Sequence, residues 1–379
     1  MAKLGEVCTI VSGSTPKTSV ASYWDGNIKW ITPAELNEDT FYIMDSVRHI
    51  TEEGKEKTGL SYLPTGTVIL SSRAPIGKTA IAGCEMCCNQ GFKNLICSDA
   101  IYNEYLYFFL KSKTDYLNSL GRGATFKEIS KPIVESIEIP LPEVNQQKEI
   151  AEKIKKLEQL ISLRKQQLAK LDELVKARFV EMFGDPVSNP FNWLTAELGN
   201  RCEIITGNTP SRAEPENYGT FIEWIKSDNI NTPSTFLTEA QERLSEIGFQ
   251  KCRFVESGSL LMTCIAGSLN CIGNVAVANR RVAFNQQINA ITPTHDNVLY
   301  LYWLMILSKP TIHRTINMAL KGILSKSQLS LIKFPFPPLP LQNQFAAFVE
   351  RVDQQKQTVQ QSLEKLELMK KALMQEYFG

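Results

Sequence analysis

Two stretches of the chain carry apolar residues spaced alternately four and three positions apart. This spacing is typical of a helix that buries one stripe against a partner helix, as in a coiled coil. Arg164 and Lys356 each interrupt one of the stripes. We predict two long helices whose seams are formed by Ile150, Ile154, Leu157, Ile161, Leu168, Leu171 and Val175, and by Phe345, Val349, Val352, Val359, Leu363, Leu366 and Leu373.

Shorter β-branched and aromatic runs precede each stripe, separated by Gly, Pro and Asn. Such runs predict strands in small, loop-rich domains. Strands are expected at Thr67–Leu70, Ala80–Ala82, Ser259–Met262 and Asn274–Ala278, and helices at Asn103–Lys113 and Asp296–Leu307. The expected fold class is therefore mixed α/β, with two small α/β domains and two long helices.

The chain also contains an internal duplication. LGEVCTI at 4–10 aligns with LGNRCEI at 198–204, and SGSTP at 12–16 aligns with TGNTP at 206–210. Later matches in the same order are IKWI with IEWI, NQ with NQ, YLYF with YLYW, PLP at 140–142 with PLP at 338–340, and EMFG with the final EYFG. One segment differs in length, because the second copy has CIAGSLNCIG where the first has SRAPIG. So many ordered matches indicate two copies of one unit.

The duplication suggests how the two stripes pair. Each seam needs a partner, and the equivalent helix of the other copy is the nearest candidate. Two equivalent helices related by a pseudo-twofold axis would pack antiparallel and would span roughly 50 Å at about 1.5 Å per residue. We expect a coiled-coil spacer that separates two repeated domains; a core helix that packs only on its own domain is the alternative.

These patterns divide the chain into four segments. We expect small α/β domains at 1–142 and 186–340, a central helix at 143–185 and a C-terminal helix at 341–379. A Pro-Leu-Pro sequence directly precedes each helical segment, where it stops the preceding structure and sets the start of the helix.

Composition is that of a globular protein, with 43% hydrophobic and 21% charged residues. No apolar run approaches the ~20 residues needed to cross a bilayer, and the first ten residues lack the features of a secretory leader. Nine cysteines, an odd number, fit a reducing compartment better than a disulfide framework. We therefore expect a cytoplasmic protein with no membrane partner.

The net charge is only +1. A protein that grips many phosphates by itself usually has a basic bias, because neutralising phosphates releases counterions and supplies most of the non-specific affinity. If this chain binds a nucleic acid, other proteins are expected to hold much of the backbone. The charge favours a subunit over a protein that binds alone.

The motifs resemble those of the specificity subunit of Type I restriction–modification enzymes. The segments that carry the resemblance are SGSTP followed by YWDGNIKWITPAEL, TGNTPSR followed by ENYGTFIEWIKSDNI, and the Pro-Leu-Pro entries into the long helices. The match covers essentially the whole chain. It implies that each recognition domain reads one half of a split, asymmetric double-stranded DNA target, with the helices fixing the spacer between the halves.

The resemblance also implies partners and the absence of catalysis. Two methyltransferase subunits, which bind S-adenosylmethionine, would dock on the chain. Restriction subunits, which use ATP and Mg, would join for cleavage where they exist. The specificity subunit itself would hold no cofactor and catalyse nothing.

Sequence motifs for catalysis or cofactor binding are incomplete. Lys78 lies in an Ile-Gly-Lys-Thr string like the end of a phosphate-binding loop, but Ser72 stands where that loop needs glycine. Cys84, Cys87 and Cys88 give one CxxC spacing without a second pair or a nearby histidine, so buried thiols are expected rather than zinc. The three histidines do not match between the copies, and the Asn-Pro-Phe string at 189–191 lacks the second proline of a methyltransferase motif. We therefore do not expect an enzyme.

Candidate DNA contacts lie on polar loops, because Arg, Lys, Asn, Gln and Ser side chains read base edges. Lys17 and Arg212 follow the Thr-Pro motif and are expected to contact phosphates. A solvated loop residue is the alternative at each position, and the matching Asn-Gln pairs could instead be scaffold. The other candidates are Ser72, Arg73, Lys78, Asn89, Gln90, Arg122 and Lys127 in the first copy, and Ser268, Asn270, Asn285, Gln286, Gln287, Lys321 and Lys326 in the second.

The leading hypothesis is a sequence-specific DNA-recognition subunit that directs methyltransferase and restriction subunits to a bipartite target. A scaffold with two ligand-binding domains on a coiled coil, without nucleic acid, is the first alternative, and the near-neutral charge keeps it open. A fused enzyme with its own methyltransferase activity is the second, against which the missing motifs argue.

Overall fold

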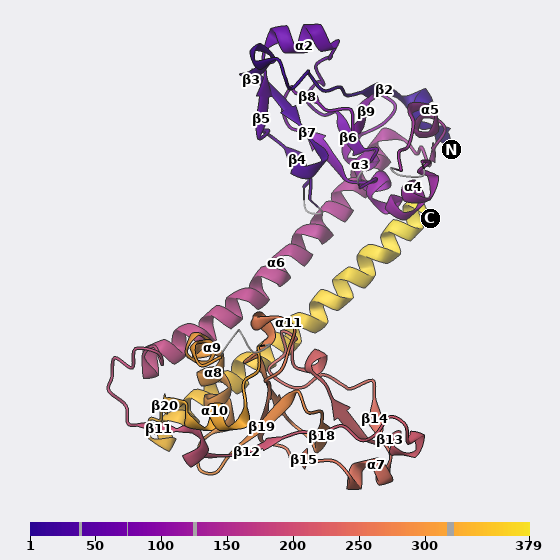
Figure 1. Ribbon diagram of the computed structural model, residues 1–379. Coiled ribbons are helices and arrows are strands. Elements are labelled where there is room, and N and C mark those ends of the chain that lie inside the picture. The colour runs from indigo at the N-terminus through magenta and orange to yellow at the C-terminus, as the bar shows by residue number, and fades with distance from the viewer. Residues whose placement is uncertain (38–39, 74, 124–126, 317–321) are drawn as a thin grey trace. The chain divides into compact units, whose positions relative to one another are not determined.

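The computed structural model describes residues 1–379 except 38–39, 74, 124–126 and 317–321. The chain forms two compact units: the first contains Met1–Lys165 and Gln361–Gly379, and the second contains Gln166–Gln360. Both long helices, α6 (Val144–Phe183) and α11 (Leu339–Phe378), contribute one part to each unit (Figure 1). The four-segment division keeps each helix whole and remains a prediction.

The first unit is built on two main sheets. One has the strand order β2-β9-β6-β7-β4 and the other the order β5-β3-β8, while β1 pairs with β10. The strands are β1 (Ala2–Lys3), β2 (Cys8–Ser12), β3 (Trp24–Ile31), β4 (Tyr42–Ile43), β5 (Arg48–Ile50), β6 (Val68–Ser71), β7 (Thr79–Ala82), β8 (Cys87–Cys88), β9 (Phe92–Cys97) and β10 (Glu138–Ile139). The helices beside them are α1 (Leu4–Val7), α2 (Glu52–Thr58), α3 (Asn103–Ser112), α4 (Thr114–Leu120) and α5 (Lys131–Glu135), with 3₁₀ turns η1 (Ala21–Tyr23) and η2 (Pro33–Glu35).

The second unit repeats this arrangement. Its sheets have the orders β12-β19-β16-β17 and β14-β13-β18-β15, and β11 pairs with β20. The strands are β11 (Thr195–Glu197), β12 (Cys202–Thr206), β13 (Tyr218–Ile225), β14 (Arg243–Leu244), β15 (Phe254–Val255), β16 (Ser259–Thr263), β17 (Val275–Ala278), β18 (Val282–Phe284), β19 (Ile288–Pro293) and β20 (Lys333–Pro335). The helices are α7 (Glu246–Gln250), α8 (Val298–Leu307), α9 (Lys309–Arg314) and α10 (Lys326–Leu331), with 3₁₀ turns η3 (Leu198–Asn200), η4 (Pro215–Asn217), η5 (Ser227–Asn229) and η6 (Leu269–Cys271).

The two units share register as well as order. β2 pairs antiparallel with β9 and β9 with β6, just as β12 pairs with β19 and β19 with β16. In the other sheet the long strand β3 pairs parallel with β8, and β13 pairs parallel with β18. The predicted duplication, the mixed α/β fold class, the four expected strands and the two expected shorter helices are confirmed.

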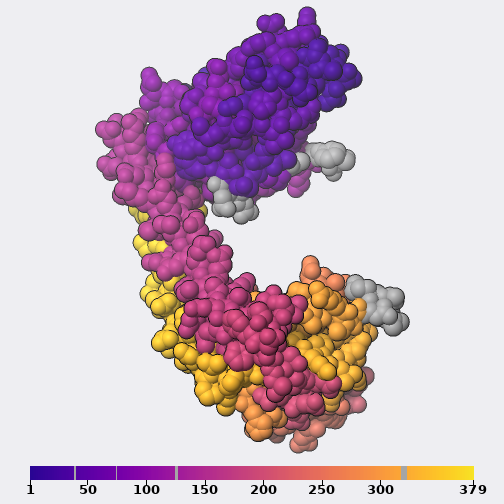
Figure 2. Space-filling model, turned by 90° about the vertical axis from the view of Figure 1, so that its left-hand side faces the viewer, coloured from indigo at the N-terminus to yellow at the C-terminus, as the bar shows by residue number. Residues whose placement is uncertain are grey.

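The long helices pack antiparallel within each unit. In the first unit Lys165 lies 3.4 Å from Glu367, and Glu158 lies 2.5 Å from Lys370. In the second unit Asp172 pairs with Lys356, the polar break of the predicted seam. Residue numbers rise along one helix as they fall along the other, and the helices lie side by side in both views (Figures 1 and 2). All the predicted seam residues are buried or half-buried, so the predicted coiled coil is confirmed.

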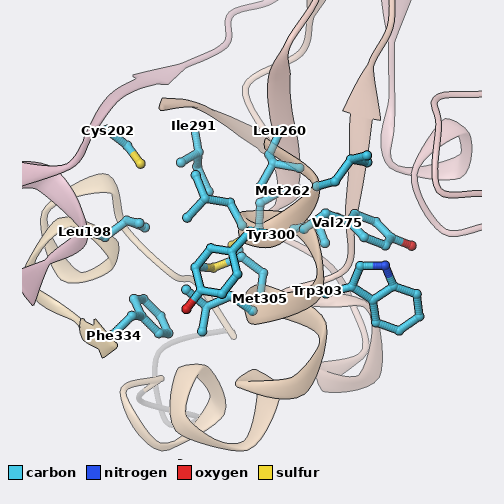
Figure 3. Close-up of a cluster of buried hydrophobic side chains, with 14 of the residues drawn as sticks. Leu198, Cys202, Leu260, Met262, Val275, Ile291, Tyr300, Trp303, Met305 and Phe334 are labelled. Atoms are coloured by element: carbon cyan, nitrogen blue, oxygen red, sulfur yellow. The ribbon is translucent and has the colours of Figure 1, made fainter. Parts of the chain in front are cut away.

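Each long helix ends on the α/β domain of the other copy. Phe183 near the end of α6 packs on Tyr300 of α8 with ring centroids 5.0 Å apart. The equivalent Phe378 near the end of α11 packs on Tyr105 of α3 at 5.1 Å. These contacts explain why Glu-x-Phe-Gly recurs, because its phenylalanine completes a core at both helix ends. Figure 3 shows Tyr300 within the buried cluster of the second unit.

At the starts of the two long helices, the residues that are equivalent in the structure differ from those that the sequence alignment pairs. Tyr105 Oη donates to Pro140 O at 2.9 Å, and its equivalent Tyr300 Oη donates to Pro335 O at 2.8 Å. Buried glutamines follow the same offset: Gln147 Nε2 donates to Pro142 O, and Gln342 Nε2 to Pro337 O, both at 2.8 Å. The alignment of the two Pro-Leu-Pro segments is therefore wrong by three residues, because these buried hydrogen bonds fix the equivalence and the shared letters do not.

Candidate nucleic-acid interface

The Gly-x-Thr-Pro loop of the first unit lies against the Asn-Gln turn before β9. A Cβ atom on Gly13 would lie 1.9 Å from Asn89 O, so only glycine fits this approach. The Thr15 hydroxyl hydrogen-bonds Gln90 Oε1. Trp30 Nε1 donates to Ser14 O at 3.0 Å and holds the loop from the other side.

The second unit has the same arrangement. A Cβ atom on Gly207 would lie 2.2 Å from Asn285 O, and the Thr209 hydroxyl hydrogen-bonds Gln286 Oε1. Trp224 Nε1 donates to Asn208 O at 3.4 Å. These contacts give the matching Asn-Gln pairs a structural role in both copies. Their role as DNA contacts, predicted for Asn89, Gln90, Asn285 and Gln286, remains a prediction.

Three loops of the first unit meet where β6 ends. Ser72 N donates to Gly91 O at 2.7 Å, and Ile129 N donates to Ser72 O at 3.0 Å. Isolated β-bridges join Glu128 to both Arg73 and Arg122. The structure thus brings Ser72, Arg73 and Arg122 together, although they are up to 50 positions apart in the sequence. We call this meeting point the first strand-end junction.

Polar side chains dominate the first junction. Lys93 is buried, and its Nζ lies 3.0 Å from Glu128 Oε1 and 3.4 Å from Ser72 Oγ. Ser72 itself is fully buried, whereas Arg73 is half-buried and Arg122 is exposed. Lys127, also exposed, precedes the bridge residue Glu128.

Lys78, expected to be a DNA-facing lysine, contacts the protein's own backbone. Its Nζ donates to Leu36 O at 2.5 Å and to Pro33 O at 3.2 Å. These carbonyls lie at the 3₁₀ turn η2, so the ammonium group ties β7 to the segment after β3. The structure gives Lys78 a scaffold contact, and a DNA contact there remains a prediction.

The equivalent loops of the second unit form the second strand-end junction, where β16 ends. Cys264 N donates to Gln287 O at 2.8 Å, and Leu324 N donates to Cys264 O at 2.9 Å. An isolated β-bridge joins Ile265 to Ile323. The backbone frame is that of the first junction, but the bridge residues are aliphatic. Burial raises the pKa of the Cys264 thiol to about 12, so it stays neutral.

The enlarged loop of the second unit follows this junction. Ser268 and Asn270 are exposed on the loop around η6. Lys309 of α9 donates from Nζ to Asn270 O and to Asn274 Oδ1, both at 2.5 Å. Desolvation lowers the pKa of Lys309. Lys309 therefore holds the loop backbone, while Ser268 and Asn270 are exposed to solvent.

The remaining candidates lie apart from the junctions or at their edge. Lys17 is exposed in the loop after Thr-Pro, and Lys326 is exposed at the first position of α10. Arg212 lies over the Tyr218 ring at 5.2 Å and 2.9 Å from Glu242. Gln287 is half-buried and closes the second Asn-Gln turn through its N–H to Asn285 Oδ1 at 3.0 Å. Lys321 lies outside the described residues.

Sequence analysis missed the bridge residues Glu128, Ile265 and Ile323. The signal available was an isoleucine in the Gly-flanked segment KGILSK, inside a loop already selected for its lysines. Among the described residues, no three His, Cys, Asp or Glu side chains form a group that could hold a metal ion. In the described part of the chain, no helix is both long and apolar enough to cross a membrane.

Comparison with known proteins agrees with this architecture. The model of the Type I restriction modification DNA specificity domain matches the chain twice, at residues 1–173 and 190–368. The MjaIX specificity subunit of Methanocaldococcus jannaschii is 35% identical over 229 residues, or 55% of this chain. The MjaVIII subunit of the same organism is 23% identical over 74% of this chain and 70% of its own length. The chain spans 53% of the length of the MjaIX subunit.

Solved structures share the fold. The Type-I restriction-modification S subunit from M. genitalium covers the whole chain with a TM-score of 0.61 at 15% identity, and 95% of that subunit is covered in turn. A chain from a study of complex assembly in the type I R-M system covers it with a TM-score of 0.63 at 18% identity, with 96% of that chain covered. The duplicated sheets, the paired helices and the two matches to the family model agree: the chain belongs to the family of Type I restriction–modification DNA specificity subunits.

Proposed function

We propose that this chain reads a bipartite double-stranded DNA target, one half-site for each recognition domain, and directs partner methyltransferase and restriction subunits to it. The observation that carries the proposal is the pair of strand-end junctions. They share a backbone frame but differ in side chains, as two readers of different half-sites must. Base edges are distinguished by such side chains, since hydrogen-bonding and apolar groups select different bases.

The chain acts in this proposal without catalysis of its own. Two methyltransferase subunits bind S-adenosylmethionine, and restriction subunits, where present, use ATP and Mg. The near-neutral net charge of +1 supports shared DNA binding, because the partners then contribute much of the phosphate contact. The predicted boundaries at 1–142, 143–185, 186–340 and 341–379 separate readers from helices in this scheme.

The experiment is expression of the chain with its methyltransferase subunits in a methylation-deficient bacterium, followed by sequencing of methylated adenines. We expect one split recognition sequence. Arg73→Ala should relax one half of it and Asn270→Ala the other, each lost base contact costing about 1–3 kcal/mol. Lys57→Ala and Asn200→Ala, at exposed positions on α2 and η3, are matched controls and should leave the sequence unchanged.

Three results would contradict the proposal. Relaxation of the same half by both variants would mean that the two domains do not read separate half-sites. Absence of any recognised sequence, with all subunits present and folded, would favour a scaffold that binds no nucleic acid. Turnover of S-adenosylmethionine by the pure chain would overturn the non-catalytic role.

A further inference from the structure

The two strand-end junctions can be compared position by position. Ser72 N donates to Gly91 O at 2.7 Å, as Cys264 N donates to Gln287 O at 2.8 Å. The β-bridges then make Arg73 equivalent to Ile265 and Glu128 equivalent to Ile323. The strand register makes Lys93 equivalent to Asn289, because Lys93 pairs with Leu70 and Asn289 with Met262.

Equivalent positions carry opposite chemistry. The first junction holds Arg73, Lys93 and Glu128, whereas the second holds Ile265, Asn289 and Ile323 at the same places. The bridge residue reaches the surface in both junctions: Glu128 is half-buried and Ile323 is 41% exposed. A single exposed isoleucine is unremarkable on most surfaces. Here it occupies the site where the other copy places a charged side chain.

In the first junction, two of these charged side chains form an ion pair and the third does not. Lys93 and Glu128 neutralise each other at 3.0 Å, with Lys93 buried. Among the described residues, the Arg73 guanidinium has no ion-pair partner. Arginine in the major groove binds the O6 and N7 acceptors of guanine. At the place of Ile265, the first junction therefore offers an uncompensated donor group for a guanine.

The second junction offers no charge at these positions. Its exposed group is the aliphatic Ile323, with Ile265 half-buried opposite it. The apolar group on the major-groove edge of a base pair is the C5-methyl of thymine. We propose that Ile323 recognises a thymine methyl group in the second half-site, at the place where the first domain uses Arg73 to read a guanine. This inference rests on the proposed function and assigns base classes to its two junctions.

The test removes one methyl group from the DNA. Once the target is known from the methylation map, the thymines of the second half-site are replaced by deoxyuridine one at a time, each in a separate synthetic duplex. Affinity is measured with the complete complex of chain and methyltransferase subunits. We expect about fourfold weaker binding of the uracil duplex, the effect of burying one methyl group. Ile323→Ala should bind the two duplexes equally, and Ile323→Val should keep part of the preference.

The controls separate a local contact from a general effect. Ile247→Ala removes the same side chain from α7 of the same domain, where Ile247 is 50% exposed, and should keep the fourfold preference. Circular dichroism confirms that each variant is folded, and Ile323→Val remains informative if Ile323→Ala is not. Uracil in the first half-site should affect the wild type and Ile323→Ala alike.

The failures of the two proposals are distinguishable. A second half-site without an A·T pair, or equal binding of thymine and uracil duplexes by the wild type, would overturn the role of Ile323 while leaving bipartite recognition intact. Retention of the thymine preference by Ile323→Ala would also overturn it. Absence of any specific duplex would instead contradict the proposed function.

Discussion

Substitution of Gly207 by alanine tests the lock between the Gly-x-Thr-Pro loop and the Asn-Gln turn. The added Cβ would lie 2.2 Å from Asn285 O and 2.4 Å from Phe284 O. Both atoms belong to the backbone, so neither can rotate away, and the loop must move by about 1 Å or more to reach van der Waals contact. Overpacking of this kind costs about 1–3 kcal/mol. In a unit of this size the melting temperature should fall by roughly 2–12 °C.

Gly267→Ala is the matched control. Gly267 lies in the enlarged loop of the same unit, and a Cβ there would meet no atom within 4 Å. Alanine at such a position should be neutral or stabilise by up to about 1 kcal/mol, because it restricts the unfolded chain. Both proteins would be compared by thermal unfolding under circular dichroism. Gly207→Ala should also loosen recognition of the second half-site, since the contact between Thr209 and Gln286 depends on the loop position.

One result would refute this reasoning. If Gly207→Ala and Gly267→Ala unfold at the same temperature, the close approach to Asn285 O does not constrain the loop. The recurrence of glycine at 13 and 207 would then need another cause.

Three further predictions follow from other parts of the structure. Asp296→Ala should lower the free energy of unfolding by about 3 kcal/mol in denaturant titration, because its buried carboxylate accepts from Arg201 at 2.7 and 2.9 Å; Glu256→Ala in the exposed pair with Arg281 should cost less than about 1 kcal/mol. The Arg280 guanidinium lowers the pKa of Glu223 below its usual 4.5, so the pair stabilises the fold above pH 4.5 and this stabilisation is lost as the pH falls through the lowered pKa. Glu223→Gln should abolish this part of the acid destabilisation. If the pH profile of unfolding is the same in Glu223→Gln and wild type, the pair makes no such contribution. Matched insertions of four residues after Leu160 and Leu368 add ~6 Å of helix, which is close to two base-pair steps of ~3.4 Å. They should lengthen the spacer between the two half-sites of the recognised sequence. Selection of the original spacer would show that the helices do not set the spacer length.

The sequence predicted best what depends on periodicity. The helical seams were evident because every member, from Ile154 to Val359, must face one partner, and no loop interrupts the count. The paired glutamines Gln147 and Gln342 were not aligned, because their equivalence lies in buried hydrogen bonds to proline carbonyls and not in the neighbouring letters. Hydrogen bonds between a side chain and a distant carbonyl leave no repeating pattern in the sequence from which they could be predicted.

The candidate site was predictable as a set of loops and unpredictable as a set of contacts. Arg73 and Glu128 meet through a β-bridge between segments 55 positions apart, and the mistaken alignment of the two Pro-Leu-Pro segments, three residues off, conceals the match between Glu128 and Ile323. Lys78 was chosen for its charge, but its ammonium group satisfies the carbonyls of Pro33 and Leu36. A basic residue in a polar loop indicates where a surface lies without indicating where the side chain points.

The strand-end junctions and the Gly-x-Thr-Pro loops differ in what holds their backbone, and this difference explains how the two copies could diverge in one place and not in the other. At the strand-end junctions the frame is held by backbone groups, such as Ile129 N with Ser72 O and Leu324 N with Cys264 O, which every residue except proline can supply. Arg73 and Glu128 can therefore give way to Ile265 and Ile323 without loss of the bridge. At Gly13 and Gly207 the frame depends on the absence of a side chain, so no such exchange is open. A duplicated reader built in this way can change the base that it recognises while keeping the loop that presents it.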